Sequence, residues 1–260
     1  MTSSLEREDK MEVINELLGY PKLKIYQDPE RFNFSVDSMI VAAFATIKYN
    51  TKNIIDLGSG NCPIPLFLTL RTRAHIDAVE IQDGSYELGR KSIEINNLGD
   101  QITLYHDDIR GINKRVGFQK YDLVISNPPF FKYKEGSNIN KNDYKTIARH
   151  EVMLDLDSLC KEVILLLNNG GTFAMVHRPD RLTDIFNTLR KYGLEPKRMQ
   201  LVYPKASLEA NHVLIEAKRS NQQGGLKVLP PLIIHNDDGT YSSEILKIYN
   251  QRDEVNEKNL

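Results

Sequence analysis

The sequence has few cysteines, no long apolar run and almost no net charge. Cys62 and Cys160 are its two cysteines in 260 residues, and they do not form a CxxC pair, so neither a disulfide framework nor a cysteine-based metal site is expected. We therefore expect a reducing, cytoplasmic environment. No apolar run is long enough to cross a bilayer, and the polar first ten residues do not look like a signal peptide, so we expect no membrane attachment.

Acidic and basic residues nearly balance, with 35 Asp and Glu against 34 Lys and Arg. This balance argues against a protein coated in positive charge. It does not exclude a local basic face, because affinity for nucleic acid depends on where cations cluster. The length suits one large domain with extensions.

Strand and helix patterns alternate along most of the chain, which predicts an α/β fold with a mostly parallel sheet covered by helices on both faces. The predicted strands are 53–60, 75–81, 101–109, 121–127, 172–178, 199–205 and 211–219, and the helices between them are 63–72, 85–99, 156–171 and 179–193. Before this region we predict helices over 11–18 and 37–48, with a strand-like stretch over 22–34. Ligands of such folds bind at the carboxyl ends of the strands.

A glycine turn, DLGSG, closes the first strand of this region. Gly58 and Gly60 allow close approach of the backbone to a ligand. A dinucleotide fingerprint would need a glycine where Pro63 stands, and the carboxylate of Asp56 would repel a pyrophosphate but suit a cation. The plainer alternative is a tight turn of any α/β domain.

Acidic residues also end the next two predicted strands. Glu80 follows the glycine turn by about twenty residues, where a carboxylate can accept hydrogen bonds from ribose hydroxyls. Asp107 and Asp108 end the third strand, and either could accept from an adenine amine; we favour Asp108, because it directly precedes the apolar Ile109. Together with Asp56 these groups suit S-adenosylmethionine rather than NAD, although each alone could be a surface carboxylate.

The strand at 121–127 ends in the sequence ISNPPF. Asn127 offers an amide oxygen and Pro128 a backbone carbonyl, and both can accept hydrogen bonds from an exocyclic amine. Pro129 stiffens the turn, and Phe130 offers a face for stacking a planar base. This arrangement would raise the nucleophilicity of the amine for attack on a sulfonium methyl group. The alternative is a rigid turn with a buried phenylalanine.

With these motifs the chain resembles class I S-adenosylmethionine-dependent methyltransferases of the N-methylating kind, and more narrowly the bacterial tRNA(Val) adenine-N6 methyltransferase family. The narrower resemblance also rests on further segments. These are IYQDPERFNFSVDSMIVAAF, ARHE, VYPK followed by VLIEAKR, and PPLIIHNDDGTYSSE.

The resemblance implies a Rossmann-like class I methyltransferase fold with a seven-stranded sheet. It implies an N-terminal extension with a cofactor-capping helix (1–50), a catalytic domain (51–220) and a C-terminal extension with a disordered end (221–260). It places Phe34 and Asp37 over the cofactor, and the other residues named above against the cofactor or the target base. The implied activity is methylation of the N6 of an adenine in tRNA, next to the anticodon of tRNA(Val), without a metal.

Basic residues that follow the predicted strands 121–127 and 172–178 are candidates for phosphate contacts with tRNA. They are Lys132, Lys134, Lys145, Arg149, Arg178 and Arg181. Each could equally be a solvated surface cation. Three other functions remain open: methylation of a glutamine in a release factor, methylation of guanine N2 in ribosomal RNA, and an RNA-binding scaffold without catalysis. The sequence does not fix the oligomeric state, although we favour a monomer.

Overall fold

The computed structural model describes residues 12–17, 20–28, 36–128 and 155–249. Its main sheet has nine strands in the order β10-β8-β9-β7-β6-β3-β4-β5, with β11 also paired to β8. The strands are β3 (Asn53–Leu57), β4 (His75–Glu80), β5 (Ile102–His106), β6 (Tyr121–Ser126), β7 (Leu167–His177), β8 (Leu194–Tyr203), β9 (His212–Arg219), β10 (Lys227–Val228) and β11 (Leu232–Ile233). The helices are α1 (Val36–Phe44), α2 (Pro63–Leu68), α3 (Asp83–Ile95), α4 (Asn113–Val116), α6 (Leu156–Leu166), α7 (Leu182–Lys191) and α8 (Ser243–Tyr249), with a short 3-10 turn η1 (Pro179–Arg181).

The seven strands predicted from the sequence are confirmed as β3 to β9. Strands β3 to β7 pair in parallel, and β9 runs antiparallel between β7 and β8. This arrangement is the mostly parallel, Rossmann-like sheet expected for the fold. The short strands β10 and β11 add parallel pairs along β8. They therefore cover a strand that would otherwise be an exposed edge.

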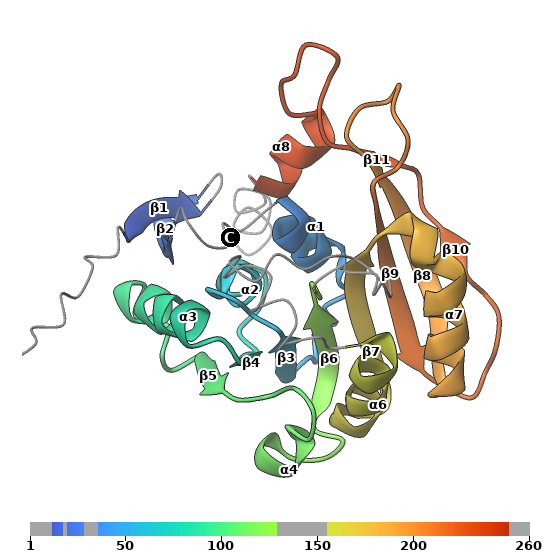
Figure 1. Ribbon diagram of the computed structural model, residues 1–260, viewed down its shortest axis with the longest axis horizontal. Coiled ribbons are helices and arrows are strands. Elements are labelled where there is room, and N and C mark those ends of the chain that lie inside the picture. The colour runs from blue at the N-terminus through green and yellow to red at the C-terminus, as the bar shows by residue number, and fades with distance from the viewer. Residues whose placement is uncertain (1–11, 18–19, 29–35, 129–154, 250–260) are drawn as a thin grey trace, which may run out of the picture.

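Helices cover both faces of the sheet, as Figure 1 shows. The first face packs against α1, α2 and α3, and its buried core includes Met39, Leu66 and Ile76. The second face packs against α4, α6 and α7, and its core includes Val124, Leu159 and Ile185. Because β3 and β6 are buried on both faces, each contains a short apolar run in the sequence, whereas β4 also buries Asp77.

The prediction of a helix over residues 11–18 is wrong. Residues 13–17 form β1 (Val13–Leu17), which pairs antiparallel with β2 (Tyr20–Gln27) in a separate two-stranded sheet. Val13 and Ile14 remain 38% and 48% exposed, whereas Leu17 is fully buried. Apolar spacing suggested a helix, but so short a helix is marginal in water, and pairing with β2 satisfies the backbone instead.

Helix α1 is anchored at its carboxyl end, which fixes the position of its first turn. The buried carboxylate of Glu216 on β9 accepts hydrogen bonds from Thr46 N at 2.7 Å and Thr46 Oγ1 at 3.0 Å. Arg71 donates to the carbonyl oxygens of Ala42 and Ala45. Orphan carbonyls at a helix end need such partners. The amino end of α1 is thereby held over the carboxyl end of β6 and the amino end of β9.

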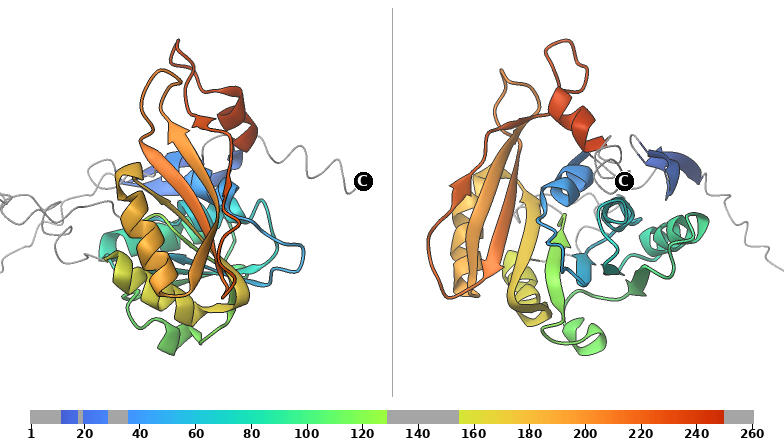
Figure 2. Two further views of the ribbon diagram at one scale, coloured as in Figure 1. Left: turned by 90° about the vertical axis from the view of Figure 1, so that its right-hand side faces the viewer. Right: turned by 180° about the vertical axis from the view of Figure 1, so that it is seen from behind.

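The C-terminal segment returns to the first face of the sheet. Helix α8 lies beside α1, which is visible from behind in Figure 2. The hydroxyl of Tyr20 on β2 donates to the carbonyl of Ile248 at 2.9 Å, so the first and last described parts of the chain touch. No helix among the residues that the structure describes is long and apolar enough to span a bilayer.

Candidate active site

The glycine turn after β3 is held open by its backbone conformation. Gly58 and Gly60 have φ values of +79° and +55°, a region that side chains rarely adopt. The N–H groups of Gly58 and Ser59 both donate to the carbonyl of Val79 at 2.9 Å, which ties the turn to β4. Helix α3 approaches closely, since a Cβ on Gly89 would lie 2.9 Å from Cys62 Sγ. The turn is therefore a rigid backbone surface suited to a ligand.

Asp56 is a buried carboxylate without a partner. It lies at the end of β3 with no exposed surface, and neither of its oxygens accepts a hydrogen bond from the described residues. Burial raises its pKa well above the usual range, and the nearby carboxylate of Glu80 raises it further. Such a group costs stability unless a ligand completes it. An ammonium group, as on the amino-acid part of S-adenosylmethionine, fits this need.

Glu80 ends β4 and lies against the glycine turn. Its Oε2 accepts from Gly60 N at 2.7 Å and its Oε1 accepts from Gln82 N at 2.8 Å. Burial raises the pKa of Glu80, and these backbone hydrogen bonds oppose that shift. The two bonds fix the carboxylate, and each oxygen keeps a lone pair for a hydroxyl group. The structure thus brings Asp56, Glu80 and the two glycines together, as the sequence predicted.

Asn127 follows the end of β6 and is half-buried. Its Nδ2 lies 3.2 Å from Ser38 Oγ on α1 and donates a hydrogen bond to it. Its Oδ1 has no hydrogen-bond partner among the described residues, so it remains available to accept from a ligand. Next to it, the hydroxyl of Ser126 donates to the carbonyl of Leu57 at 2.7 Å, which joins the ends of β6 and β3.

The carboxylates after β5 already have cationic partners. Asp108 accepts two hydrogen bonds from the guanidinium of Arg110, at 2.9 and 2.5 Å on Oδ2, and this side-chain contact holds the pKa of Asp108 below its usual range. Asp107 pairs with Arg115 at 2.7 Å. Their side chains are 33% and 38% exposed. If Asp108 binds adenine, its carboxylate therefore has to accept from the adenine amine and from Arg110 at the same time.

Three predicted residues at this edge have partners of opposite charge, and others lie outside the part of the chain that the structure describes. Asp37, in the first turn of α1, lies 3.6 Å from His212 on β9. Arg178 and Arg181 follow β7 but pair with Asp180 at 3.7 Å and Asp184 at 2.7 Å. The predicted residues outside the described part of the chain are Phe34, Pro129, Phe130, Lys132, Lys134, Lys145 and Arg149.

Three residues at this edge escaped the sequence reasoning. Ser38 contacts Asn127, but a serine in an apolar helix gives no signal of that contact. Ile109 lies close to the turn, since a Cβ on Gly58 would be 3.8 Å from its Cδ1. His177 ends β7 beside the Asn-Pro turn, and burial, reinforced by Arg181, lowers its pKa to about 4. This imidazole is therefore neutral at physiological pH.

Comparison with known proteins identifies the family of this chain. Residues 35–150 match the family model described as the methyltransferase small domain. A protein of Porphyromonas gingivalis named tRNA1(Val) (adenine(37)-N6)-methyltransferase is 30% identical over 202 residues, which cover 76% of this chain and 78% of the relative. A protein of the same name from Dyadobacter fermentans is 27% identical over 221 residues, covering 85% of this chain and 89% of the relative.

Solved structures agree on the fold. A predicted O-methyltransferase from Agrobacterium tumefaciens superimposes with a TM-score of 0.64 at 19% identity, covering 83% of this chain and 96% of that chain. Geranyl diphosphate C-methyltransferase from Streptomyces coelicolor, in complex with S-adenosyl-L-homocysteine, has a TM-score of 0.51 at 11% identity, covering 71% of this chain and 77% of that chain. This chain is an S-adenosylmethionine-dependent methyltransferase and belongs to the tRNA1(Val) (adenine(37)-N6)-methyltransferase family.

Proposed function

We propose that this protein methylates the N6 of an adenine in tRNA(Val), at the position next to the anticodon that its relatives' names give as 37. The observation that carries the proposal is the orientation of Asn127. Its Nδ2 bonds to Ser38, and its Oδ1 has no partner among the described residues. This oxygen can therefore accept a hydrogen bond at the end of β6, which lies next to the strand of Asp56, with the strand of Glu80 beyond it.

Each residue has a defined part in this proposal. When bound, S-adenosylmethionine supplies an electrophilic methyl group on a sulfonium. Asp56 takes the ammonium of its amino-acid part, and Glu80 takes the ribose hydroxyls. Asn127 Oδ1 and the carbonyl of Pro128 accept the two hydrogens of the adenine amine. This interaction draws the lone pair of the amine away from the ring, and the rigid Asn-Pro turn holds the amine in place.

No strong base is needed for this chemistry, because the attacking nitrogen becomes acidic once it is alkylated. His177 and the Asp37–His212 pair lie at the same edge of the sheet as Asn127. Phe130 and the lysines after it, which lie outside the described residues, remain proposed contacts for the base and for RNA phosphates. Asp108, Arg178 and Arg181 stay proposed contacts that would have to leave or share their present partners. A substrate of this kind places the enzyme in the cytoplasm.

Acceptor competition tests the proposal. Purified protein and labelled S-adenosylmethionine are incubated in separate reactions with four acceptors. They are an unmodified tRNA(Val) transcript, the same transcript with guanine instead of adenine at position 37, a release factor, and a ribosomal RNA fragment. We expect label in the first transcript alone. Equal labelling of the guanine-substituted transcript would refute the choice of adenine, and label in the release factor or the ribosomal RNA would identify one of the alternative acceptors.

A further inference from the structure

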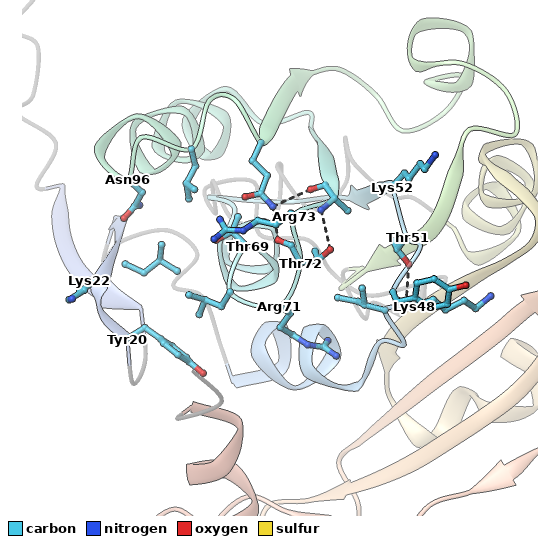
Figure 3. Close-up of a pocket in the computed structure, with 17 residues that line it drawn as sticks. Tyr20, Lys22, Lys48, Thr51, Lys52, Thr69, Arg71, Thr72, Arg73 and Asn96 are labelled. Atoms are coloured by element: carbon cyan, nitrogen blue, oxygen red, sulfur yellow. Dashed lines mark hydrogen bonds between the residues drawn. The ribbon is translucent and has the colours of Figure 1, made fainter. Parts of the chain in front are cut away.

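A cavity lies at the end of the sheet opposite to the candidate active site, where strands β3, β4 and β5 begin. It is open, has a volume of about 940 Å³, and is lined by residues that precede β3, β4 and β5, by the start of β2, and by the ends of α2 and α3. We call it the amino-edge pocket, and Figure 3 shows its lining. The pocket is separate from the candidate active site, because the glycine turn and Asn127 follow the carboxyl ends of the same strands.

The lining of the amino-edge pocket contains five basic side chains and no Asp or Glu. They are Lys22, Lys48, Lys52, Arg71 and Arg73. Arg71 has a structural task, because it donates to carbonyls of α1, and its burial lowers its pKa. The other four cations are exposed, and none of them forms an ion pair within the described residues. Asp122, outside the lining, lies close enough to Lys48 to interact with its charge, but no carboxylate lines the cavity itself, so the cavity attracts anions.

This pocket differs from the place where the sequence predicted phosphate contacts. Arg178 and Arg181, at the carboxyl edge, are each paired with an aspartate. The chain as a whole carries a formal net charge of −1, so unpaired cations are not forced on it by composition. At the amino-edge pocket, an incoming anion can therefore contact a cation without first displacing an ion-pair partner.

The shape of the pocket and one aromatic residue indicate the kind of anion. Figure 3 shows Lys22 and Asn96 on one side, Lys48 and Lys52 on the other, and Arg73 between them. This spread suits an extended polyanion better than a single phosphate. Tyr49, beside Lys48, is completely exposed at 102%. An exposed aromatic ring among lysines is the combination that binds nucleic-acid backbone and stacks on bases.

We propose that the amino-edge pocket binds the sugar–phosphate backbone of the RNA substrate at a point remote from the reacting base. This inference rests on the proposed function. The two places are one strand apart, since the five residues of β3 span roughly 17 Å, and a folded RNA presents phosphates over a much larger distance. Strand β2 also joins them, because its start lines the pocket and its Tyr26 carbonyl accepts from Asn61 of the glycine turn at 2.7 Å.

The test uses charge reversal with a matched control. The pocket variant is Lys48→Glu with Lys52→Glu, and the control is Lys114→Glu with Lys161→Glu, two exposed lysines in α4 and α6 on the other face of the sheet. Affinity for an unmodified tRNA(Val) transcript is measured by filter binding across a salt series, with affinity for S-adenosylmethionine measured by calorimetry. A Tyr49→Ala variant tests stacking separately.

We expect the pocket variant to bind the transcript at least tenfold more weakly than the control. The slope of log affinity against log salt should fall by about 1.4 to 1.8, because two phosphate contacts are lost. Tyr49→Ala should weaken binding about fivefold or more. Affinity for the cofactor, and kcat at saturating tRNA, should be unchanged, because these residues lie away from the reacting groups.

Failure of this inference can be told apart from failure of the proposed function. If the wild type methylates tRNA(Val) but the pocket variant binds the transcript as tightly as the control variant does, the pocket is not an RNA site. The same conclusion follows if both double variants lose affinity equally. A wild type that methylates no tRNA overturns the proposed function, and this inference with it.

Discussion

Substitution of Ser38 by alanine removes the hydroxyl that accepts the hydrogen bond from Asn127 Nδ2 at 3.2 Å. A net hydrogen bond of this kind contributes about 0.5–1.5 kcal/mol. If all of it holds Asn127 in its reactive orientation, kcat should fall about 2- to 12-fold. Neither the KM for tRNA nor the affinity for S-adenosylmethionine should change much, because Ser38 lies on α1 and touches the amide rather than the glycine turn.

The measurement is single-turnover methylation of a tRNA(Val) transcript, with thermal unfolding recorded in parallel. Ser242→Ala is the matched control: Ser242 is equally buried, and its hydroxyl bonds to the carbonyl of Ile233 at 2.6 Å, away from the candidate active site. It should lower stability without lowering kcat. An unchanged kcat in Ser38→Ala, or an equal fall of kcat in Ser242→Ala, would show that the hydrogen bond from Ser38 does not hold Asn127 in its reactive orientation.

Three further predictions concern the glycine turn. Asp56→Asn should abolish measurable cofactor binding in calorimetry. Because it removes a buried carboxylate without a partner, it should also raise the Tm of the ligand-free protein near neutral pH, by about 2–4 °C for each 1 kcal/mol of burial cost that is relieved. A lower Tm would show that the carboxylate stabilises the fold. Burial raises the pKa of Asp56, and a cationic ligand needs the ionised carboxylate, so affinity for S-adenosylmethionine should rise as the pH rises through that raised pKa. An affinity that does not change with pH would show that Asp56 does not bind the cofactor. Gly89→Ala places a Cβ 2.9 Å from Cys62 Sγ and 3.3 Å from Gly60 O. It should therefore lower the free energy of unfolding in denaturant by about 1–3 kcal/mol and weaken cofactor binding. If stability and cofactor affinity both stay unchanged, the glycine turn can shift to accommodate the added methyl group.

The sequence predicted the central part of the fold well because burial leaves a direct pattern. Strands β3 and β6 are covered on both faces, so they contain short apolar runs. Gly58 and Gly60 mark a turn whose positive φ values favour glycine. The placement of Asp56 and Glu80 side by side follows from the parallel order of their strands. These features depend on neighbours that are close in sequence or fixed by the sheet.

The sequence could not show contacts that depend on distant packing. Residues 13–17 have helical apolar spacing, but pairing with β2 decides their conformation. The arginine partners of Asp107 and Asp108 lie within eight residues, yet nothing in the sequence separates a paired carboxylate from one free for a ligand. The contact of Ser38 with Asn127 joins residues 89 positions apart. The amino-edge pocket likewise collects its lysines and arginines from three separate segments.

The proposed function requires that Asn127 promotes transfer of a methyl group to the N6 of adenine in tRNA(Val). The most direct measurement is mass spectrometry of nucleosides from a tRNA(Val) transcript after incubation with labelled S-adenosylmethionine and either the wild type or Asn127→Ala. We expect labelled N6-methyladenosine with the wild type and none with the variant, although the variant's cofactor affinity stays within about tenfold, or 1.4 kcal/mol. Labelled N6-methyladenosine at equal levels from both proteins, or label on guanosine instead, would contradict it.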